Sequence, residues 1–245
     1  MLFSTGKLDG FVIAAADGEI GTVRHAYFDD ERWVIRHLVV QAGSWLKGRH
    51  VLVSPHAVTG IEPDRKRLLV SLTRAQVEQA PDIDTDKPVS RQQEARYYDY
   101  YGYPYYWAGA GLWGAAALPL AYVPLAGTIA ANRNGEPPAS AQQRDSRGDP
   151  HLRSTVEVAG YEIEAIDGSI GAVEDFLFDA SSWAILHVVV DTRKWLPGRK
   201  VLIDPAEIAS VDWPRRHVRV RLTREQVKAS DPYVPEEMLG SASHA

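Results

Sequence analysis

The stretch DGEIGTVRHAYFDDERWVIRHLVVQAGSWLKGRHVLVSP, residues 17–55, decides how this chain folds, because it returns at residues 167–205 as DGSIGAVEDFLFDASSWAILHVVVDTRKWLPGRKVLIDP. The two stretches align without insertion or deletion at an offset of 167 minus 17, or 150 residues. The same frame extends to residues 10–77 against 160–227 with roughly 40 % identity, far above the chance level for an ungapped alignment. The chain is therefore predicted to contain one structural unit twice.

The composition is that of an ordinary globular protein and argues against several functional classes. The 245 residues are 45 % hydrophobic and 24 % charged with a net charge of -5, which gives no general attraction to nucleic acid or anionic lipid. The absence of cysteine excludes disulfides, thiol catalysis and thiolate metal sites without identifying a compartment. Residues 1–7 lack the basic and apolar regions of a signal peptide, so a cytoplasmic location is expected.

Short apolar runs separated by turn residues predict a β-rich unit in each copy. Asp17 and Gly18 form the kind of pair that a tight hairpin turn requires. The pattern predicts about six short antiparallel strands per copy, those of the first copy at residues 10–15, 20–28, 33–41, 49–53, 58–62 and 68–72. Because closure removes the exposed edges of so small a sheet, each copy is predicted to form a small β-barrel.

Each copy is expected to end in a short helix. Thr73 and Gln76 have the spacing of a capping box, and Thr223 and Gln226 repeat it. The predicted fold is therefore all-β, with two small antiparallel barrels in tandem, each closed by a short helix and joined by an aromatic and apolar linker. The expected boundaries are 1–82 for the first barrel, 83–155 for the linker, 156–232 for the second barrel and 233–245 for a flexible tail.

One strand differs between the copies in a way that suggests a covered surface. Residues 34–40 carry Arg36 on one face, and residues 184–190 carry Leu186 in its place. Without the arginine the second strand is apolar on both faces, as expected if a partner surface covers it. A repeated unit can form within one chain the contact that a homodimer forms between two, so we expect the barrels to pack as a pseudo-symmetric pair, with a homo-oligomer as the alternative.

The linker has two interpretations. Residues 97–107 are dense in tyrosine and residues 108–131 are apolar without charge, which is long enough to span a bilayer beside an aromatic belt. Glycines and prolines interrupt a regular helix, however, and no basic cluster flanks the segment. We therefore favour a loop or arm packed on protein, with disordered polar flanks at 82–96 and 132–150.

The order of these motifs resembles a known domain. The Asp-Gly turn followed by Ile-Gly, the strand ILHVVV at 185–190 and the segment WLPGRKVLIDP at 195–205 together resemble the PRC-barrel domain. That small β-barrel occurs in the cytoplasmic part of the photosynthetic reaction centre H subunit and in ribosome maturation factors. The resemblance covers residues 10–80 and 160–230, and the tandem arrangement is similar to bacterial tandem PRC-barrel proteins. It implies the fold and a role in interaction or assembly, but no single activity.

Residues that invite a chemical role have simpler structural interpretations. His37 and His187 alternate in phase with apolar residues, which favours a hydrogen-bonded, partly buried histidine over a metal or proton-transfer site. The repeated aspartates lie at strand ends, where a carboxylate bonds the local backbone. These are Asp17, Asp29, Asp167 and Asp179. No nucleophile context or phosphate-binding glycine loop is recognised, so the sequence predicts no catalytic residue, no cofactor and no metal site.

Basic and aromatic side chains are the predicted interaction residues. Arg219 and Arg221 share one face of the last strand, where they could contact RNA or an acidic protein, although glutamates such as Glu164 on neighbouring strands favour a solvated face. Trp45 and Trp195 each lie in a loop before Leu and Gly, and are either barrel plugs or binding anchors. The remaining candidates are Arg199, Tyr101, Tyr103, Trp107 and Trp113.

The sequence thus favours a non-catalytic, cytoplasmic interaction or assembly module that binds an unknown protein through the aromatic linker and the Trp loops. One alternative is a membrane-associated accessory factor of a photosynthetic or electron-transfer complex, similar to the reaction centre H subunit. Another is an RNA-processing or ribosome-assembly factor that acts through the arginine strand, although the net charge gives no reason to expect nucleic acid.

Overall fold

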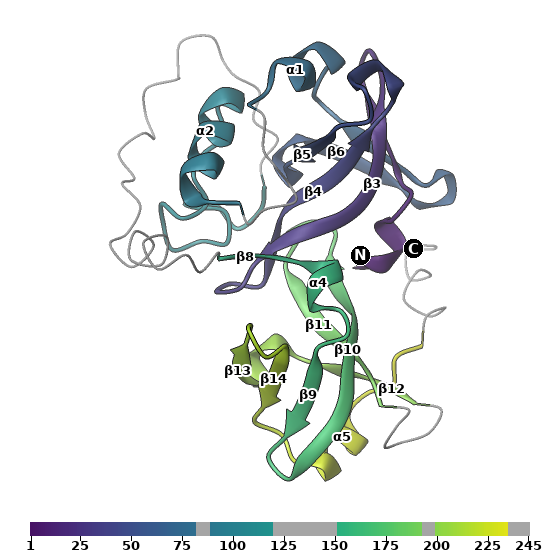
Figure 1. The fold of residues 1–245 in the computed structure, drawn as a ribbon, viewed down its shortest axis with the longest axis vertical. Helices are drawn as coiled ribbons and strands as arrows, with labels where there is room; N and C mark the ends of the chain where they lie inside the picture. The colour runs from purple at the N-terminus through teal and green to yellow at the C-terminus, as the bar shows by residue number, and fades with distance from the viewer. Residues whose placement is uncertain (82–88, 120–150, 193–198, 235–245) are drawn as a thin grey trace, which may run out of the picture. The chain divides into compact units, whose positions relative to one another are not determined.

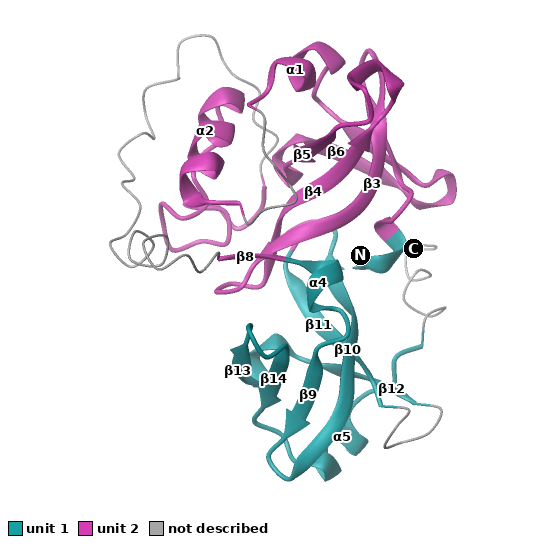
Figure 2. Cartoon of the chain, in the orientation of Figure 1, with its two compact units in different colours: residues 1–7, 154–180, 184–245 teal, residues 8–153, 181–183 magenta. Residues whose placement is uncertain are grey.

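The chain forms two compact units, each built around one β-sheet (Figure 2). The computed structural model describes residues 1–81, 89–119, 151–192 and 199–234. Unit 1 comprises Met1–Lys7, Ser154–Ala180 and Ala184–Ala245. Unit 2 comprises Leu8–Arg153 and Ser181–Trp183.

Unit 2 contains the whole of the first copy. Its seven-stranded sheet has the order β5-β4-β3-β2-β7-β6, and β8 pairs with β3 outside this path (Figure 1). The strands are β2 Val12–Ala15, β3 Gly18–Asp29, β4 Val34–Ala42, β5 His50–Val53, β6 Val58–Glu62, β7 Arg67–Val70 and β8 Leu152–Ser154. The α-helices are α1 Arg74–Gln79 and α2 Arg91–Tyr101. Apolar side chains of the long strands, among them Val23, Phe28 and Leu38, are fully buried and form the core.

Unit 1 contains most of the second copy and repeats this arrangement. Its seven-stranded sheet has the order β12-β11-β10-β9-β14-β13, and β1 pairs with β10 outside this path. The strands are β1 Leu2–Ser4, β9 Glu162–Ala165, β10 Gly168–Asp179, β11 Ile185–Asp191, β12 Lys200–Ile203, β13 Ile208–Asp212 and β14 His217–Val220. The α-helices are α4 Thr155–Val158 and α5 Arg224–Ala229.

The duplicated, mostly β architecture predicted from the sequence is confirmed, but the sheets are mixed. β2 runs parallel to β7, and β9 runs parallel to β14. The expectation of purely antiparallel sheets is therefore wrong, because the first strand of each copy meets a late strand that runs in the same direction. Closure of each sheet into a barrel stays a prediction.

The repeated Ile-Gly motif has a steric cause. A Cβ atom on Gly21 would lie 2.0 Å from the carbonyl oxygen of Gln41, and one on Gly171 would lie 2.0 Å from that of Asp191. Both distances are far below van der Waals contact, so any side chain at these positions would push neighbouring strands apart. The glycine is needed for close strand pairing in both copies.

A β-bulge recurs on the strand that differs between the copies. The pairing of β3 with β4 skips Arg36, and the pairing of β10 with β11 skips Leu186. A bulge leaves one residue unpaired and turns its side chain out of the regular alternation. The simple two-face alternation expected over residues 33–41 therefore breaks at Arg36, beside His37.

The short segment before each copy belongs to the sheet of the other copy. β1 pairs antiparallel with β10, where Phe3 lies opposite Phe178. β8 pairs with β3 in turn. The expected domain 1–82 therefore loses residues 1–7 to unit 1, and the described parts of the expected linker, up to Arg153, belong to unit 2.

The Asp-Gly turn of each copy is fastened to the closing helix. Both predicted capping boxes are present. In addition, the Asp17 carboxylate accepts a hydrogen bond of 2.8 Å from the amide of Arg74, and Asp167 accepts one of 2.7 Å from Arg224. A carboxylate at a helix N-terminus satisfies a free amide and complements the helix dipole. The turn role expected for these aspartates is extended by this long-range contact.

The described part of the linker packs on protein, as expected, but it begins with a helix in place of a disordered flank. Residues 91–101 form α2, so the expectation of disorder over 82–96 is wrong for residues 89–96. Residues 82–88 and 120–150, on which the rest of that expectation falls, lie outside the described residues. In the described part of the chain, no helix combines the length and the apolar character needed to cross a membrane.

Candidate functional site

Residues 89–119 form an aromatic layer on unit 2, here called the aromatic cap. α2 begins after Ser90, whose hydroxyl accepts a hydrogen bond from the amide of Gln93, and ends at Gly102, which has a φ of 70°. A side-chain cap at the start and a left-handed glycine at the end are the usual limits of a helix. The helix lies beside β4 and β5 (Figure 1).

Tyr97 joins α2 to β5. Its hydroxyl donates to the carbonyl oxygen of Leu52 at 3.1 Å and accepts from the amide of Ser54 at 3.0 Å. Its ring meets that of His37 edge to face, with the centroids 5.1 Å apart. Burial, reinforced by neighbouring tyrosines, raises the pKa of Tyr97 well above its ordinary value of 10.0, so the hydroxyl keeps its proton.

His56 anchors the far end of the cap. Its ring stacks on Tyr103 at a centroid distance of 5.1 Å and meets Trp113 edge to face at 4.9 Å. The Trp113 indole nitrogen donates to the carbonyl oxygen of Ser182 at 2.7 Å. Aromatic contacts of this geometry add to the free energy gained from burial.

The bulged Arg36 is a second anchor. Its guanidinium donates to the Asp29 carboxylate at 2.7 Å and to the carbonyl oxygen of Leu112 at 2.6 Å. It also lies over the ring of Tyr106, 3.8 Å from the centroid. The arginine is fully buried, and its charge is matched by the aspartate and by the negative face of the ring.

Glu94 is the centre of a buried polar cluster. Its carboxylate has no exposed surface and lies 2.5 Å from His151 Nε2, 2.9 Å from the Tyr106 hydroxyl, 3.2 Å from Arg91 Nη1 and 3.4 Å from His37 Nε2. Burial alone would raise the pKa of Glu94. His151, His37 and Arg91 outweigh burial and hold that pKa well below its ordinary value of 4.5.

This cluster attaches the cap to the sheet. Its polar atoms face one another rather than solvent, and among the described residues no group of three or more His, Asp or Glu side chains is arranged to hold a metal ion. The hydrogen bond expected for His37 is confirmed, and the side chain is fully buried where partial burial was expected. The sheet surface under the cap is therefore occupied by the chain itself.

The equivalent surface of unit 1 is open to solvent. We define the open face as Leu186, His187, Leu202, Asp204 and Ala206, which correspond by the offset of 150 to Arg36, His37, Leu52, Ser54 and His56. The five first-copy residues are at most 4 % exposed. In unit 1, Leu186 is 42 % exposed, Asp204 and Ala206 are exposed, and His187 and Leu202 are half-buried. The strand that was expected to be covered on both faces therefore exposes Leu186 to solvent. Pairing of the two barrels stays a prediction.

The two Trp loops are described unequally. The Trp45 indole donates to the carbonyl oxygen of Ile20 at 3.0 Å, and the Arg74 guanidinium lies 4.5 Å from its ring centre. These contacts favour a structural role for this half-buried side chain. Trp195 lies outside the described residues, and neighbouring Arg199 donates to the carbonyl oxygen of Ser230 at 2.8 Å.

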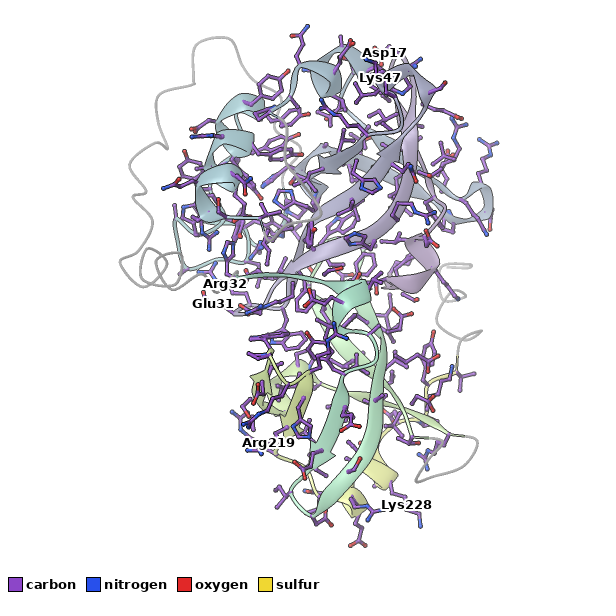
Figure 3. The ribbon with its side chains drawn as sticks, viewed as in Figure 1. Asp17, Glu31, Arg32, Lys47, Arg219 and Lys228 are labelled. Carbon is purple, nitrogen blue, oxygen red and sulfur yellow. The ribbon has the colours of Figure 1, made fainter. Side chains whose placement is uncertain are left out.

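The arginine strand has its charges balanced. Arg219 lies on the surface of β14 (Figure 3), with its Nε 3.6 Å from the Glu164 carboxylate. Arg221 donates to the carbonyl oxygen of Ala206 at 2.6 Å. A shallow hollow of about 680 Å³ next to Arg219 is lined by two carboxylates and two guanidinium groups. The solvated face opposed by Glu164 fits this arrangement better than an anion-binding patch does.

The aromatic candidates of the linker are placed inside the cap. Tyr103, Trp107 and Trp113 are 8 %, 9 % and 1 % exposed, and Tyr101 is half-buried. They pack within unit 2, and the surface they leave for a partner is small.

The sequence did not single out the cap's polar residues. Glu94, Arg91 and His151 come together only in the folded unit, and Glu94 is 57 residues from His37. One signal was present: Ser90 and Gln93 have the same capping-box spacing as Thr73 and Gln76. That pattern would have predicted α2.

The fold and this surface define a duplicated, mixed β-sheet protein in which one copy carries its own aromatic cap and the other leaves the equivalent face open. No family model and no curated protein matches the chain.

Proposed function

We propose that this chain is a non-catalytic protein-interaction or assembly module built from two PRC-type barrels, in which unit 1 binds the partner. The observation that supports this proposal is the contrast between Arg36, fully buried under the cap, and Leu186, 42 % exposed at the same bulge. A leucine in a partly apolar, uncovered patch favours association, because its burial removes apolar surface from water.

Unit 2 has the supporting role in this proposal. Its cap and buried ionic cluster already use the surface that unit 1 leaves open. A duplicated fold in which one copy carries the cap and the other does not would combine a stable scaffold with a binding copy. The motif resemblance to PRC-barrel domains, which serve as assembly modules, agrees with this division.

The test is affinity capture from the source cell with three forms of the full chain. We expect the wild type and Ile166→Asp to capture the same proteins, and Leu186→Asp to lose at least one of them. Ile166 is a matched control, because it is an apolar residue of unit 1 that is 70 % exposed, at the turn between β9 and β10. An identical set of proteins on all three forms would contradict the proposal.

A further inference from the structure

We infer that the open face of unit 1 binds an aromatic, amphipathic α-helix of a partner protein, in the way that the sheet of unit 2 binds α2. This inference rests on the proposed function and names the kind of partner. Helix-in-groove binding needs apolar anchors on one helix face and a receptive surface, and unit 2 contains both halves of such a contact.

Equivalent strands form the open face of unit 1 and the covered face of unit 2. The same bulge projects Arg36 in one copy and Leu186 in the other. The histidine that meets α2 is retained as His187. A helix placed on unit 1 as α2 is placed on unit 2 would therefore meet a surface of the same backbone geometry.

The residues of the open face determine which side chains a bound helix must carry. Arg36 uses Asp29 and a backbone carbonyl as acceptors, whereas Leu186 needs apolar atoms in their place. His187 calls for an acidic side chain about one helical turn before an aromatic residue, because Glu94 stands in that relation to Tyr97 at His37.

The helix could come from this chain or from another protein. Residues 235–245 contain no tyrosine, tryptophan or phenylalanine, and residues 120–150 contain only Tyr122. The tyrosines of α2 are held on unit 2 by their own contacts. Residues 82–88 contain no aromatic residue, and residues 193–198 contain only Trp195. None of these undescribed segments has the tyrosine content of α2, so the helix is assigned to another protein.

The probe for the test is a synthetic peptide of residues 89–113, N-acetylated and fluorescently labelled. It contains Glu94, Tyr97 and Tyr98, which meet the histidine strand, and Tyr103, which meets position 56. It also contains Tyr106 and Trp113, whose rings lie over position 36 in unit 2 and would meet Leu186 in unit 1. We expect saturable binding to the full wild-type chain by anisotropy. Because α2 already occupies the equivalent face of unit 2, we expect the peptide to bind to unit 1.

Variants locate the binding. Leu186→Asp and, independently, Ala206→Glu should each weaken binding about tenfold or more, since a charge would be buried at the contact, while Ile166→Asp should leave it unchanged. A peptide with Tyr97→Ala and Tyr98→Ala should also bind about tenfold more weakly. Thermal melting shows whether each variant is folded. Because two exposed positions are tested, the second variant still tests the binding site if the first does not fold.

Three outcomes would overturn the inference. They are no peptide binding, binding that is equal in the Leu186→Asp and wild-type chains, or a wild-type homodimer in sedimentation equilibrium that Leu186→Asp dissociates, which would make the face a contact between two copies. If the peptide fails while cellular proteins still depend on Leu186, the helix inference alone fails. If capture is also independent of Leu186, the proposed function fails with it.

Discussion

At the scale of single residues, Glu94 holds the aromatic cap through its charge. Four polar groups surround its fully buried carboxylate, and two of them lie on other segments, at His37 and His151. Glu94→Gln keeps the shape but leaves Arg91 without its charged partner. Removing one member of a buried ionic cluster costs about 3 kcal/mol, so we expect unit 2 to lose about that much free energy of unfolding in urea, followed by tryptophan fluorescence.

Asp99→Asn is the matched control on the same helix, because Asp99 is exposed and its carboxylate accepts a hydrogen bond from the Tyr105 hydroxyl. It should change stability by less than about 1 kcal/mol. Because the folded pKa of Glu94 is held below 4.5, its contribution is present above pH 4.5 and is lost as the pH falls below it. The wild type and Glu94→Gln should therefore converge in acid, and an equal difference at all pH values would contradict the role of charge.

Residue-level prediction from sequence succeeded where the cause is local. The capping pairs and the Asp-Gly turns follow from short-range chemistry, and they are found where expected. Asp17 also binds Arg74, 57 residues away, and no local pattern contains that contact. The buried ionic pair between Arg36 and Asp29 was missed because the bulge changes which side chains share a face.

At the scale of elements, the N-terminal strand β1 is attached to β10 by the Asp175 carboxylate as well as by backbone pairing. Asp175 of β10 contacts the hydroxyl of Ser4. Its carboxylate also accepts a hydrogen bond of 2.7 Å from the Thr5 hydroxyl and one of 2.9 Å from the amide of Gly6. Asp175→Ala should leave these donors without an acceptor and cost about 2 kcal/mol of unit 1 stability. The direct measurement is hydrogen exchange, where the amides of residues 3–6 should lose protection while α5 keeps it.

Glu174→Ala is the control for that strand, because Glu174 is the neighbouring carboxylate and forms a partly exposed pair with Lys200. Its effect on stability should stay below about 1 kcal/mol, with β1 still protected. Loss of protection in both variants would mean that β1 responds to any charge change on β10 rather than to Asp175.

The pairing of β1 with β10 and of β8 with β3 could not be predicted from the sequence. The long strands carry enough apolar periodicity to be recognised, and both copies of each were found. The segments LFST at 2–5 and LRST at 152–155 are nearly the same and only a few residues long, so neither pattern says which copy it joins. That choice is made by tertiary contacts such as those of Asp175.

At the scale of the whole molecule, the two copies share a fold and differ in what covers it. The repeat predicted two like units, and the structure contains two seven-stranded sheets. The repeat could not indicate that the tyrosine-rich segment covers one of them, because the segment lies outside the repeated frame. The difference between Arg36 and Leu186 was visible in the sequence, but its outcome depends on the cap.

The cap should make unit 2 the alkali-sensitive part of the molecule. Burial raises the pKa of Tyr97, Tyr98, Tyr101, Tyr103 and Tyr106 above the ordinary value of 10.0. A tyrosine with a raised folded pKa adds stability below pH 10 that is lost as the pH rises toward the folded value, because only the unfolded chain ionises readily there. We expect these five of the eleven tyrosines to ionise late and together, in one step that coincides with loss of unit 2 structure.

The measurement is a titration of tyrosinate absorbance alongside circular dichroism. Glu94→Gln should move the late step to lower pH. The variant has a smaller free energy of unfolding, so a smaller contribution from tyrosine ionisation is enough to unfold unit 2. Asp99→Asn should leave the step in place. If all eleven tyrosines ionised smoothly near pH 10 with the secondary structure intact, the tyrosines would be in contact with solvent, and the contrast between a covered unit 2 and an open unit 1 would lose its basis.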